Sequence, residues 1–177
     1  MSDSPLDAAF AHVPADIVAR ARRVRLACFD VDGTLTDGAL TFDSDGRELK
    51  TFHVHDGQGL VLLRKAGIAV ALITARQGSI VERRARDLGI DAYMHVADKR
   101  AQVDRLREAL GIEPDAVAFM GDDLADIGAM REAGFAVAPA DAHRCAADVA
   151  HWQTTARGGH GAGRELCDLL LHAQGRL

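Results

Sequence analysis

The segment FDVDGTLTDG, residues 29–38, decides how the rest of this chain is interpreted. Its two carboxylates, Asp30 and Asp32, stand where an apolar run meets a turn rich in glycine and threonine. Residues two apart in an extended segment point to the same face, so both carboxylates can face one site. Two like charges this close repel each other unless a cation or a proton intervenes. The pair therefore predicts a metal site, an acid–base role, or both.

The composition predicts a soluble, cytoplasmic protein with one domain that spans residues 1–177. No apolar run reaches the ~20 residues of a membrane span, and the first residues lack the order of charges found in signal peptides. Three cysteines, an odd number without metal-type spacing, indicate reduced thiols. The net charge of −5 argues against a nucleic-acid partner.

Short apolar runs alternate with stretches of helical period, which predicts an α/β fold with a parallel sheet flanked by helices. An N-terminal packing helix is expected within residues 1–23, and a tail with a last helix within 156–177. Ligands of such sheets bind at the carboxyl ends of the strands, and Asp30, Thr74 and Asp122 each follow an apolar run. The predicted strands are 25–29, 68–73, 92–94, 116–120 and 135–138.

Residues 36–54 interrupt this alternation. Apolar residues alternate with polar ones on both sides of DSDG at 43–46, which predicts a β-hairpin flap. The next helix is expected near Gly57, so there is no room for a cap domain. A lone hairpin has exposed edges, which pairing with neighbouring subunits would cover. The alternative is a hairpin that lies on its own domain.

A second acidic motif, GDDLAD at 121–126, follows the predicted strand at 116–120. Alone, such a motif can simply cap a helix. Combined with DVDGT at 30–34, it resembles the fourth and first motifs of the haloacid dehalogenase-type phosphohydrolases. ITAR at 73–76 and the lysine at 99 resemble the second and third motifs. The resemblance implies a Rossmann-like fold and a Mg²⁺-dependent phosphatase.

The resemblance also implies roles for individual residues. Asp30 would be the nucleophile that forms an aspartyl-phosphate, and Asp32 would protonate the leaving alkoxide and then activate water. Thr74 and Lys99 would contact the transferring phosphoryl group. The implied Mg²⁺ ligands are Asp30, the backbone carbonyl of Asp32, and Asp122, with Asp126 as a supporting carboxylate.

The segment HVHDGQG, residues 53–59, allows two interpretations. His53 and His55 could form a transition-metal pair, because alternate strand residues share a face. The favoured interpretation is a substrate loop, in which Asp56 and Gly57 begin a helix whose amides face an anion. Cys28, next to the first motif, is interpreted as a packing residue.

A closer resemblance covers nearly everything from residue 24 to the C-terminus. The absent cap, the flap, the DGxG loop at 56–59 and the tail GGHGAGRELCDLLLHAQG at 158–175 resemble the 3-deoxy-D-manno-octulosonate 8-phosphate phosphatases. That family implies hydrolysis of this sugar-acid phosphate in lipopolysaccharide precursor synthesis, and a homotetramer in which flaps associate and a neighbour covers each active site. Gln58 and Val61 depart from the family, which often has an aromatic residue and an arginine there. The implied substrate contacts are Asp32, Val54, His55, Asp56, Gly57, Gln58, Arg76, Arg84 and Lys99.

Arg76 and Arg84 suit the carboxylate of a sugar acid, because a planar guanidinium can bind it with two hydrogen bonds. They are expected on one helix, about two turns apart. The glycine-rich tail at 157–160 is expected to be flexible and able to reach across a subunit interface. Two other functions stay open: a phosphatase for another sugar acid, such as a nine-carbon keto-deoxy sugar 9-phosphate, and a non-catalytic, oligomerising regulatory domain.

Overall fold

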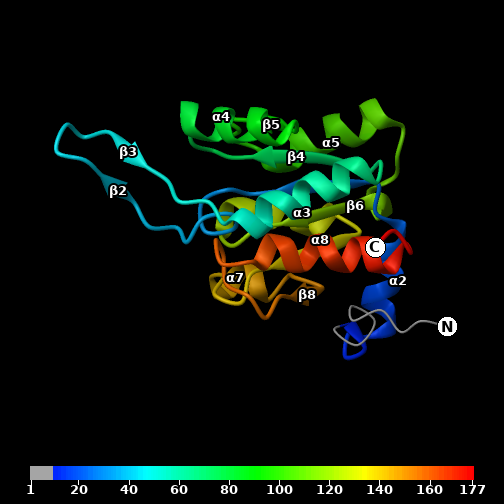
Figure 1. Cartoon of the computed structure of the whole chain (residues 1–177). Helices are drawn as coiled ribbons and strands as arrows, with labels where there is room; N and C mark the ends of the chain where they lie inside the picture. Colours follow the sequence, from blue (N-terminus) through cyan, green and yellow to red (C-terminus); the bar gives the residue numbers. More distant parts are fainter. Residues whose placement is uncertain (1–9) are drawn as a thin grey trace.

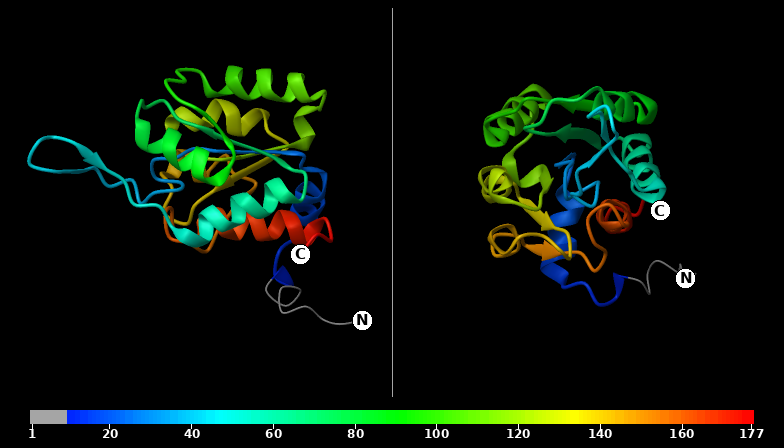
Figure 2. Two further views of the ribbon diagram at one scale, coloured as in Figure 1. Left: turned by 45° about the horizontal axis from the view of Figure 1, so that its top comes forward. Right: turned by 90° about the vertical axis from the view of Figure 1, so that its left-hand side faces the viewer.

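The computed structural model describes residues 10–177 and confirms the α/β fold, with a parallel sheet between two layers of helices (Figure 1 and Figure 2). The strands are β1 (Leu26–Phe29), β2 (Thr41–Phe42), β3 (Glu48–Leu49), β4 (Ala69–Ile73), β5 (Asp91–Tyr93), β6 (Val117–Met120), β7 (Phe135–Ala138) and β8 (Trp152–Gln153). The α-helices are α2 (Ala15–Arg23), α3 (Val54–Lys65), α4 (Ser79–Leu88), α5 (Lys99–Leu110), α6 (Ile127–Glu132), α7 (Arg144–Ala147) and α8 (Ala162–Ala173). Two 3₁₀ turns, η1 (Pro114–Ala116) and η2 (Leu124–Asp126), flank β6.

The main sheet has six strands in the order β5-β4-β1-β6-β7-β8. Strand β1 lies between β4 and β6, and Phe29 pairs with Leu72 on one side and Met120 on the other. The segments that follow these three strands therefore emerge at one edge of the sheet. The five predicted strands are confirmed to within about a residue. The sixth strand, β8, was missed because two residues are too short to show a periodic pattern.

Alternate residues of the central strands face two separate cores. In β1, Ala27 and Phe29 belong to a core with α2, α3, α4 and α8, while Leu26 and Cys28 belong to a core with α5, α6 and α7. All four of these side chains are at most 2% exposed. A strand buried on both faces reads as a continuous apolar run, which is why β1 could be predicted. Cys28 is a packing residue, as expected, and burial raises the pKa of its thiol.

The flap is a hairpin formed by β2 and β3, which projects from the body of the protein (Figure 1). Asp43 stabilises its turn by accepting hydrogen bonds from the backbone N–H groups of Asp45 and Arg47, both at 2.9 Å. The predicted end of the flap at Val54 is wrong, because Val54 is the first residue of α3. The helix also begins before Gly57, since His53 caps it by accepting from the His55 N–H at 3.2 Å. No cap domain is present among residues 10–177.

The two ends of the chain pack against each other. Helix α2 confirms the predicted N-terminal helix from Ala15 on, and residues 1–9 of that prediction lie outside the described part. It packs against α8, on which Leu166, Leu169, Leu170 and Ala173 are buried. None of the helices in the described part is long and apolar enough to cross a membrane.

The predicted flexibility of the tail at 157–160 is wrong for its two glycines. Gly158 donates its backbone N–H to Asp141 at 2.8 Å, and Gly159 donates to the Thr34 carbonyl at 3.1 Å. Both glycines are buried against the loop that follows β1. The composition suggested a loose linker. Because glycine has no side chain, these two residues instead allow two segments of the backbone to lie in close contact.

Candidate active site

The predicted nucleophile, Asp30, lies directly after β1 and is 5% exposed. Its Oδ1 pairs with the Nζ of Lys99, the first residue of α5. The same Nζ lies 2.6 Å from Oδ1 of Asp126. Asp98 caps α5 by accepting a hydrogen bond from the Ala101 N–H at 3.0 Å. This cap fixes Lys99 as the first residue of the helix, with its side chain buried. One buried ammonium thus bridges two buried carboxylates from distant parts of the chain.

Asp126 arranges the second acidic motif. Its Oδ2 accepts hydrogen bonds from the backbone N–H groups of Asp122 and Asp123, at 3.0 and 3.2 Å. Both oxygens of Asp126 are therefore engaged within the protein, and its role as a supporting carboxylate stays a prediction. Asp122 keeps its carboxylate for the site, where Oδ1 accepts from the Thr34 hydroxyl at 3.2 Å.

Gly33 allows the two acidic motifs to approach each other. Its φ of +94° favours glycine, and a Cβ at this position would lie 2.6 Å from the Asp122 Cγ. Any side chain here would push Asp122 away from the loop that carries Asp30. The glycine of DVDGT is thus required by geometry at the site as well as by the turn.

The carboxylates of this site are short of positive charge. Burial raises the pKa of Asp30 well above its ordinary value, and the charge of Asp126 raises it further, although Lys99 opposes both effects. Burial, followed by the charge of Asp126, also raises the pKa of Asp122 to about 6. One ammonium against three close carboxylates leaves an excess of negative charge that a cation would neutralise.

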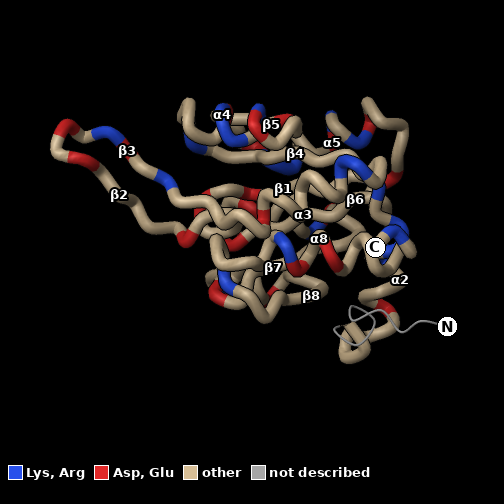
Figure 3. Tube along the Cα trace, in the orientation of Figure 1, with Lys and Arg blue, Asp and Glu red and all other residues tan. Residues whose placement is uncertain are grey.

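The donor set fits Mg²⁺. Asp30, Asp122 and Asp126 each offer a carboxylate oxygen, and the three oxygens lie within 4.8 Å of one another. Mg²⁺ prefers oxygen ligands and commonly uses only one or two carboxylates with water and phosphate. Because Asp126 is bonded to Lys99 and to backbone amides, Asp30 and Asp122 are the carboxylates best placed to bind the ion. Acidic residues gather at the end of the body from which the flap projects (Figure 3).

Asp32 meets a residue that the sequence analysis missed. Its Oδ1 pairs with the Nζ of Lys50, just after β3 on the flap, whose side chain is 4% exposed. Lys50 also bonds Glu48 Oε1 at 3.0 Å. Oδ2 of Asp32 is buried and has no hydrogen-bond partner among the described residues. The sequence indicates that Lys50 lies in the second half of the flap. The contact with Asp32 depends on how the flap folds back towards the body of the protein.

Thr74 follows β4 and is 2% exposed. It lies beside the segment after β1, because β4 pairs with β1 in parallel register. Its hydroxyl oxygen accepts from the Arg76 N–H at 3.1 Å. The prediction that Arg76 and Arg84 share a helix is wrong, since α4 begins at Ser79 and Arg76 stays in the preceding turn. Arg76 instead reaches the flap, where Nη2 lies 2.9 Å from Glu48 Oε1.

The first turns of α3 present an exposed and a buried side. Val54, His55 and Gln58 are exposed, whereas Gly57 is buried. Asp56 is 2% exposed, and its carboxylate accepts from the N–H groups of Arg164, at 2.8 Å, and Gly161, at 3.4 Å. Asp56 therefore ties α3 to the start of α8. A substrate contact by its side chain stays a prediction.

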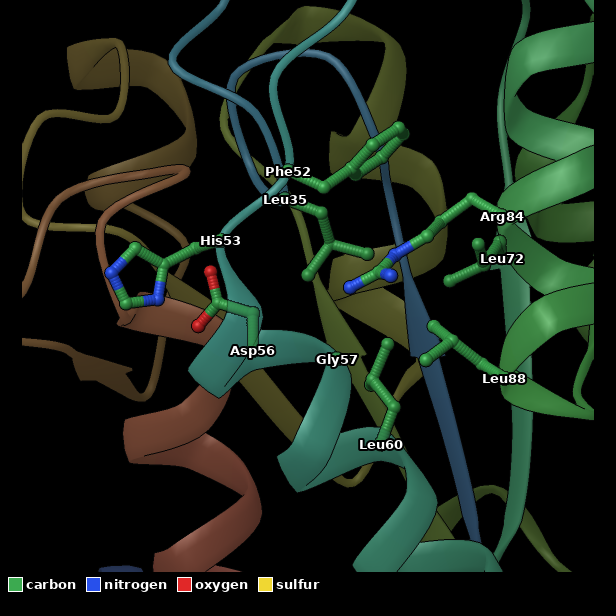
Figure 4. Close-up of a pocket in the computed structure, with 9 residues that line it drawn as sticks. All are labelled: Leu35, Phe52, His53, Asp56, Gly57, Leu60, Leu72, Arg84 and Leu88. Carbon is green, nitrogen blue, oxygen red and sulfur yellow. The ribbon is translucent and has the colours of Figure 1, made fainter.

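Arg84 lines a small pocket between α3 and α4, together with Phe52 and Gly57 (Figure 4). Its guanidinium carbon is 5.6 Å from the centre of the Phe52 ring, within the range of a cation–π interaction. The guanidinium also points towards Gly57, where a Cβ would overlap it. Gly57, the first glycine of the DGxG loop, thus makes room for an arginine side chain. The rings of His53 and His55, considered above as an alternative metal pair, have centroids 5.0 Å apart, and the two residues belong to no group of three or more metal-binding side chains in the described chain.

Known proteins resemble this chain in sequence. A family model for haloacid dehalogenase-like hydrolases matches residues 57–134. The 3-deoxy-D-manno-octulosonate 8-phosphate phosphatase KdsC of Yersinia pestis is 42% identical over 173 residues, which cover 97% of this chain and 92% of that protein. KdsC of Escherichia coli K12 is 45% identical, over 93% of this chain and 88% of that protein.

Solved structures agree with the sequence relatives. The Yersinia pestis phosphatase has a TM-score of 0.91 at 43% identity, covering 93% of this chain and 90% of that one. The phosphatase of Moraxella catarrhalis, solved with magnesium ion, phosphate ion and KDO, has a TM-score of 0.88 at 42% identity, covering 90% and 92%. The fold, the motifs and the similarity over at least 90% of this chain all indicate the same family. The chain belongs to the 3-deoxy-D-manno-octulosonate 8-phosphate phosphatase family of haloacid dehalogenase-like hydrolases.

Proposed function

We propose that this protein is a Mg²⁺-dependent phosphatase that hydrolyses 3-deoxy-D-manno-octulosonate 8-phosphate to the free sugar acid and phosphate, in lipopolysaccharide precursor synthesis. The observation that carries the proposal is the buried Asp30, held by Lys99 beside Asp122, with Asp32 two residues further on. Relatives named for this activity span nearly the whole chain.

Asp30 is the nucleophile. One of its carboxylate oxygens forms a bond to phosphorus, and the bond between phosphorus and the sugar oxygen breaks. Lys99 holds the attacking carboxylate in place and offsets charge on the phosphoryl group, and Thr74, at the end of the neighbouring strand, is the hydroxyl proposed to contact that group. Mg²⁺, bound by Asp30, Asp122 and the Asp32 carbonyl, would supply the remaining positive charge that a dianionic phosphate requires.

Asp32 transfers the protons. It donates a proton to the leaving sugar alkoxide, and in the second step it takes a proton from the water that attacks the aspartyl-phosphate. Lys50 fixes one of its oxygens, which leaves the unpartnered Oδ2 for proton transfer. The flap lysine is therefore a positioning residue for the acid–base group.

The sugar acid is bound by groups around this centre. Arg76 and Arg84 are the cations proposed for the carboxylate, and Val54, His55, Asp56, Gly57 and Gln58 form the loop proposed to contact the sugar. Arg76 is already linked to the flap through Glu48, so substrate would exchange one carboxylate for another at this guanidinium.

The test is phosphate release from 3-deoxy-D-manno-octulosonate 8-phosphate with Mg²⁺ and with EDTA. We expect EDTA to stop turnover and added Mg²⁺ to restore it. Asp30→Asn should remove turnover while Asp87→Asn, an exposed aspartate on α4 paired with Arg83, should not. Normal turnover by Asp30→Asn would exclude Asp30 as the nucleophile, and absence of turnover by the wild type with Mg²⁺ would leave the regulatory-domain alternative.

Gln58 and Val61 make the sugar itself a separate question, because both depart from the family pattern at the sugar loop. A comparison of kcat/KM for the eight-carbon 8-phosphate and a nine-carbon keto-deoxy sugar 9-phosphate decides it, since specificity is that ratio. We expect the eight-carbon substrate to give the higher value. A higher value for the nine-carbon substrate would reassign the substrate and leave the phosphate chemistry unchanged.

We also propose that the flaps associate in a cytoplasmic homotetramer. Leu40, Phe42 and Leu49 on the flap are each 54–55% exposed, an apolar surface that a second subunit would cover. The three free cysteines suit a reducing compartment. Phe42→Asp should convert tetramers to smaller species in sedimentation velocity, whereas Leu177→Asp, at an exposed leucine outside the flap, should not. A Phe42→Asp tetramer would contradict assembly through the flaps.

A further inference from the structure

A cluster of three different metal-binding side chains lies outside the catalytic carboxylates. Asp123, His143 and Cys145 each offer one ligand atom, and these atoms lie within 4.8 Å of one another. His143 Nδ1 is 2.9 Å from Cys145 Sγ, and Sγ is 3.9 Å from Asp123 Oδ1. The proposed reaction uses none of the three side chains.

We propose that these residues form a second metal site, selective for a thiophilic divalent cation such as Zn²⁺. Thiolate, imidazole and carboxylate are the ligands of tetrahedral zinc. With Zn–S of ~2.3 Å and Zn–O of ~2.0 Å, a tetrahedral site separates sulfur from oxygen by about 3.5 Å. Sγ of Cys145 is 3.9 Å from the Asp123 oxygen and 2.9 Å from the His143 nitrogen, so small side-chain rotations would place all three ligands around one ion, which would replace the Cys145 N–H at Nδ1.

The surroundings suit an open site. Asp123 and His143 are exposed and Cys145 is partly buried, so water can occupy the fourth position. When the ion binds, Cys145 gives its thiol proton to solvent and the sulfur–metal bond forms in its place. Mg²⁺ does not compete here, because it prefers an all-oxygen site such as the one at Asp30 and Asp122.

The position of the cluster connects it to the catalytic loop. Asp123 is the neighbour of Asp122 in the chain, and the His143 backbone N–H donates to the Asp122 carbonyl at 2.8 Å. Helix α7, which carries Cys145, lies at the end of the body from which the flap projects (Figure 1). An ion at the cluster would therefore fix the loop that presents Asp122.

The experiment measures alkylation of Cys145 by iodoacetamide in the full chain, with excess Mg²⁺ present and ZnCl₂ added in steps, followed by mass spectrometry. Cys28 and Cys167 are buried and serve as internal controls. Equilibrium dialysis with metal analysis gives the number of ions bound. We expect one zinc ion per chain and at least about tenfold slower alkylation of Cys145 at saturation.

Two variants locate the ion. Cys145→Ser replaces only the sulfur, and His143→Asn keeps a side-chain acceptor for the Cys145 N–H at the start of α7. Each should weaken zinc binding by about 100-fold or more, since even an outer partner of a ligand is worth 10–100-fold. His12→Gln, at an exposed histidine outside the cluster, should bind zinc as the wild type does.

Unprotected Cys145 in the wild type, or undiminished zinc binding by both variants, would overturn the proposal. In the second case the ion would lie at the carboxylates of the Mg²⁺ site. Because the readouts are thiol reactivity and bound metal, neither result depends on phosphate release, and failure here is distinct from failure of the proposed function.

Discussion

Gly158→Ala tests whether the tail supports the catalytic loop. An alanine Cβ at this position would overlap the Gly33 carbonyl oxygen and lie 2.8 Å from its carbon and 3.2 Å from the Thr36 carbonyl oxygen. Ordinary carbon–oxygen contacts are longer, so one backbone must move. Overpacking costs about 1–3 kcal/mol, and loss of the Gly159 hydrogen bond to Thr34 would add about 1 kcal/mol. We expect a loss of about 2–4 kcal/mol in the free energy of unfolding.

The same movement reaches the site, because the Gly33 carbonyl precedes Thr34, whose hydroxyl donates to Asp122. A displacement of about 1 Å in a catalytic group can reduce turnover about 100-fold. Urea unfolding and kcat for phosphate release measure the two effects. Gly128→Ala is the matched control, since its Cβ would lie 3.6 Å from the Arg100 Cβ, an ordinary contact, within helix α6. It should stabilise the protein by up to about 1 kcal/mol. A Gly158→Ala variant with wild-type stability and kcat would refute the reasoning.

Three further predictions address the flap, the pH dependence and the core. Lys50→Met should lower kcat about tenfold or more with little change in KM, because Asp32 loses the partner that orients it; steady-state kinetics that show an unchanged kcat would contradict this. Burial, followed by the charge on Arg20, lowers the pKa of His151 below 6.5, and its Nδ1 accepts from the Ala136 N–H, so the unfolded state takes up a proton that the folded state refuses. The free energy of unfolding should therefore fall as the pH drops below about 6.5, and urea melts of His151→Asn should lack that part of the decline. Leu63→Ala, at a side chain that is 0% exposed, should cost about 2–5 kcal/mol in the same melts.

The strands and the motif residues could be predicted from the sequence because each leaves a local signal. Strand β1 is buried on both faces, which produces a continuous apolar run that needs no knowledge of its partners. Parallel strands also bring their carboxyl ends to one edge, so topology alone places the segments that carry Asp30, Thr74 and Asp122 at the same edge of the sheet. The motif residues could be predicted because each occupies a fixed place just after a recognisable strand.

The missed features depend on contacts between distant segments. Lys50 is an ordinary surface residue in the sequence, and only the path of the flap places it on Asp32. The contact of Asp56 with the start of α8, more than 100 residues away, also left no local signal, and its predicted contact with substrate stays a prediction. Gly158 and Gly159 suggested a flexible tail, because glycine composition alone does not distinguish a loose linker from a close contact between two backbone segments.

The side chains of the flap have two different surroundings. Glu48 and Lys50 point into the site, where they bond Arg76 and Asp32. The apolar side chains of the same hairpin, such as Phe42, remain exposed and available to a neighbour. A two-stranded hairpin is marginally stable alone, so whatever covers its apolar side also fixes the position of Lys50. In the proposed homotetramer, a neighbour that covers Phe42 would therefore also help to hold Lys50 against Asp32, the proposed acid–base group.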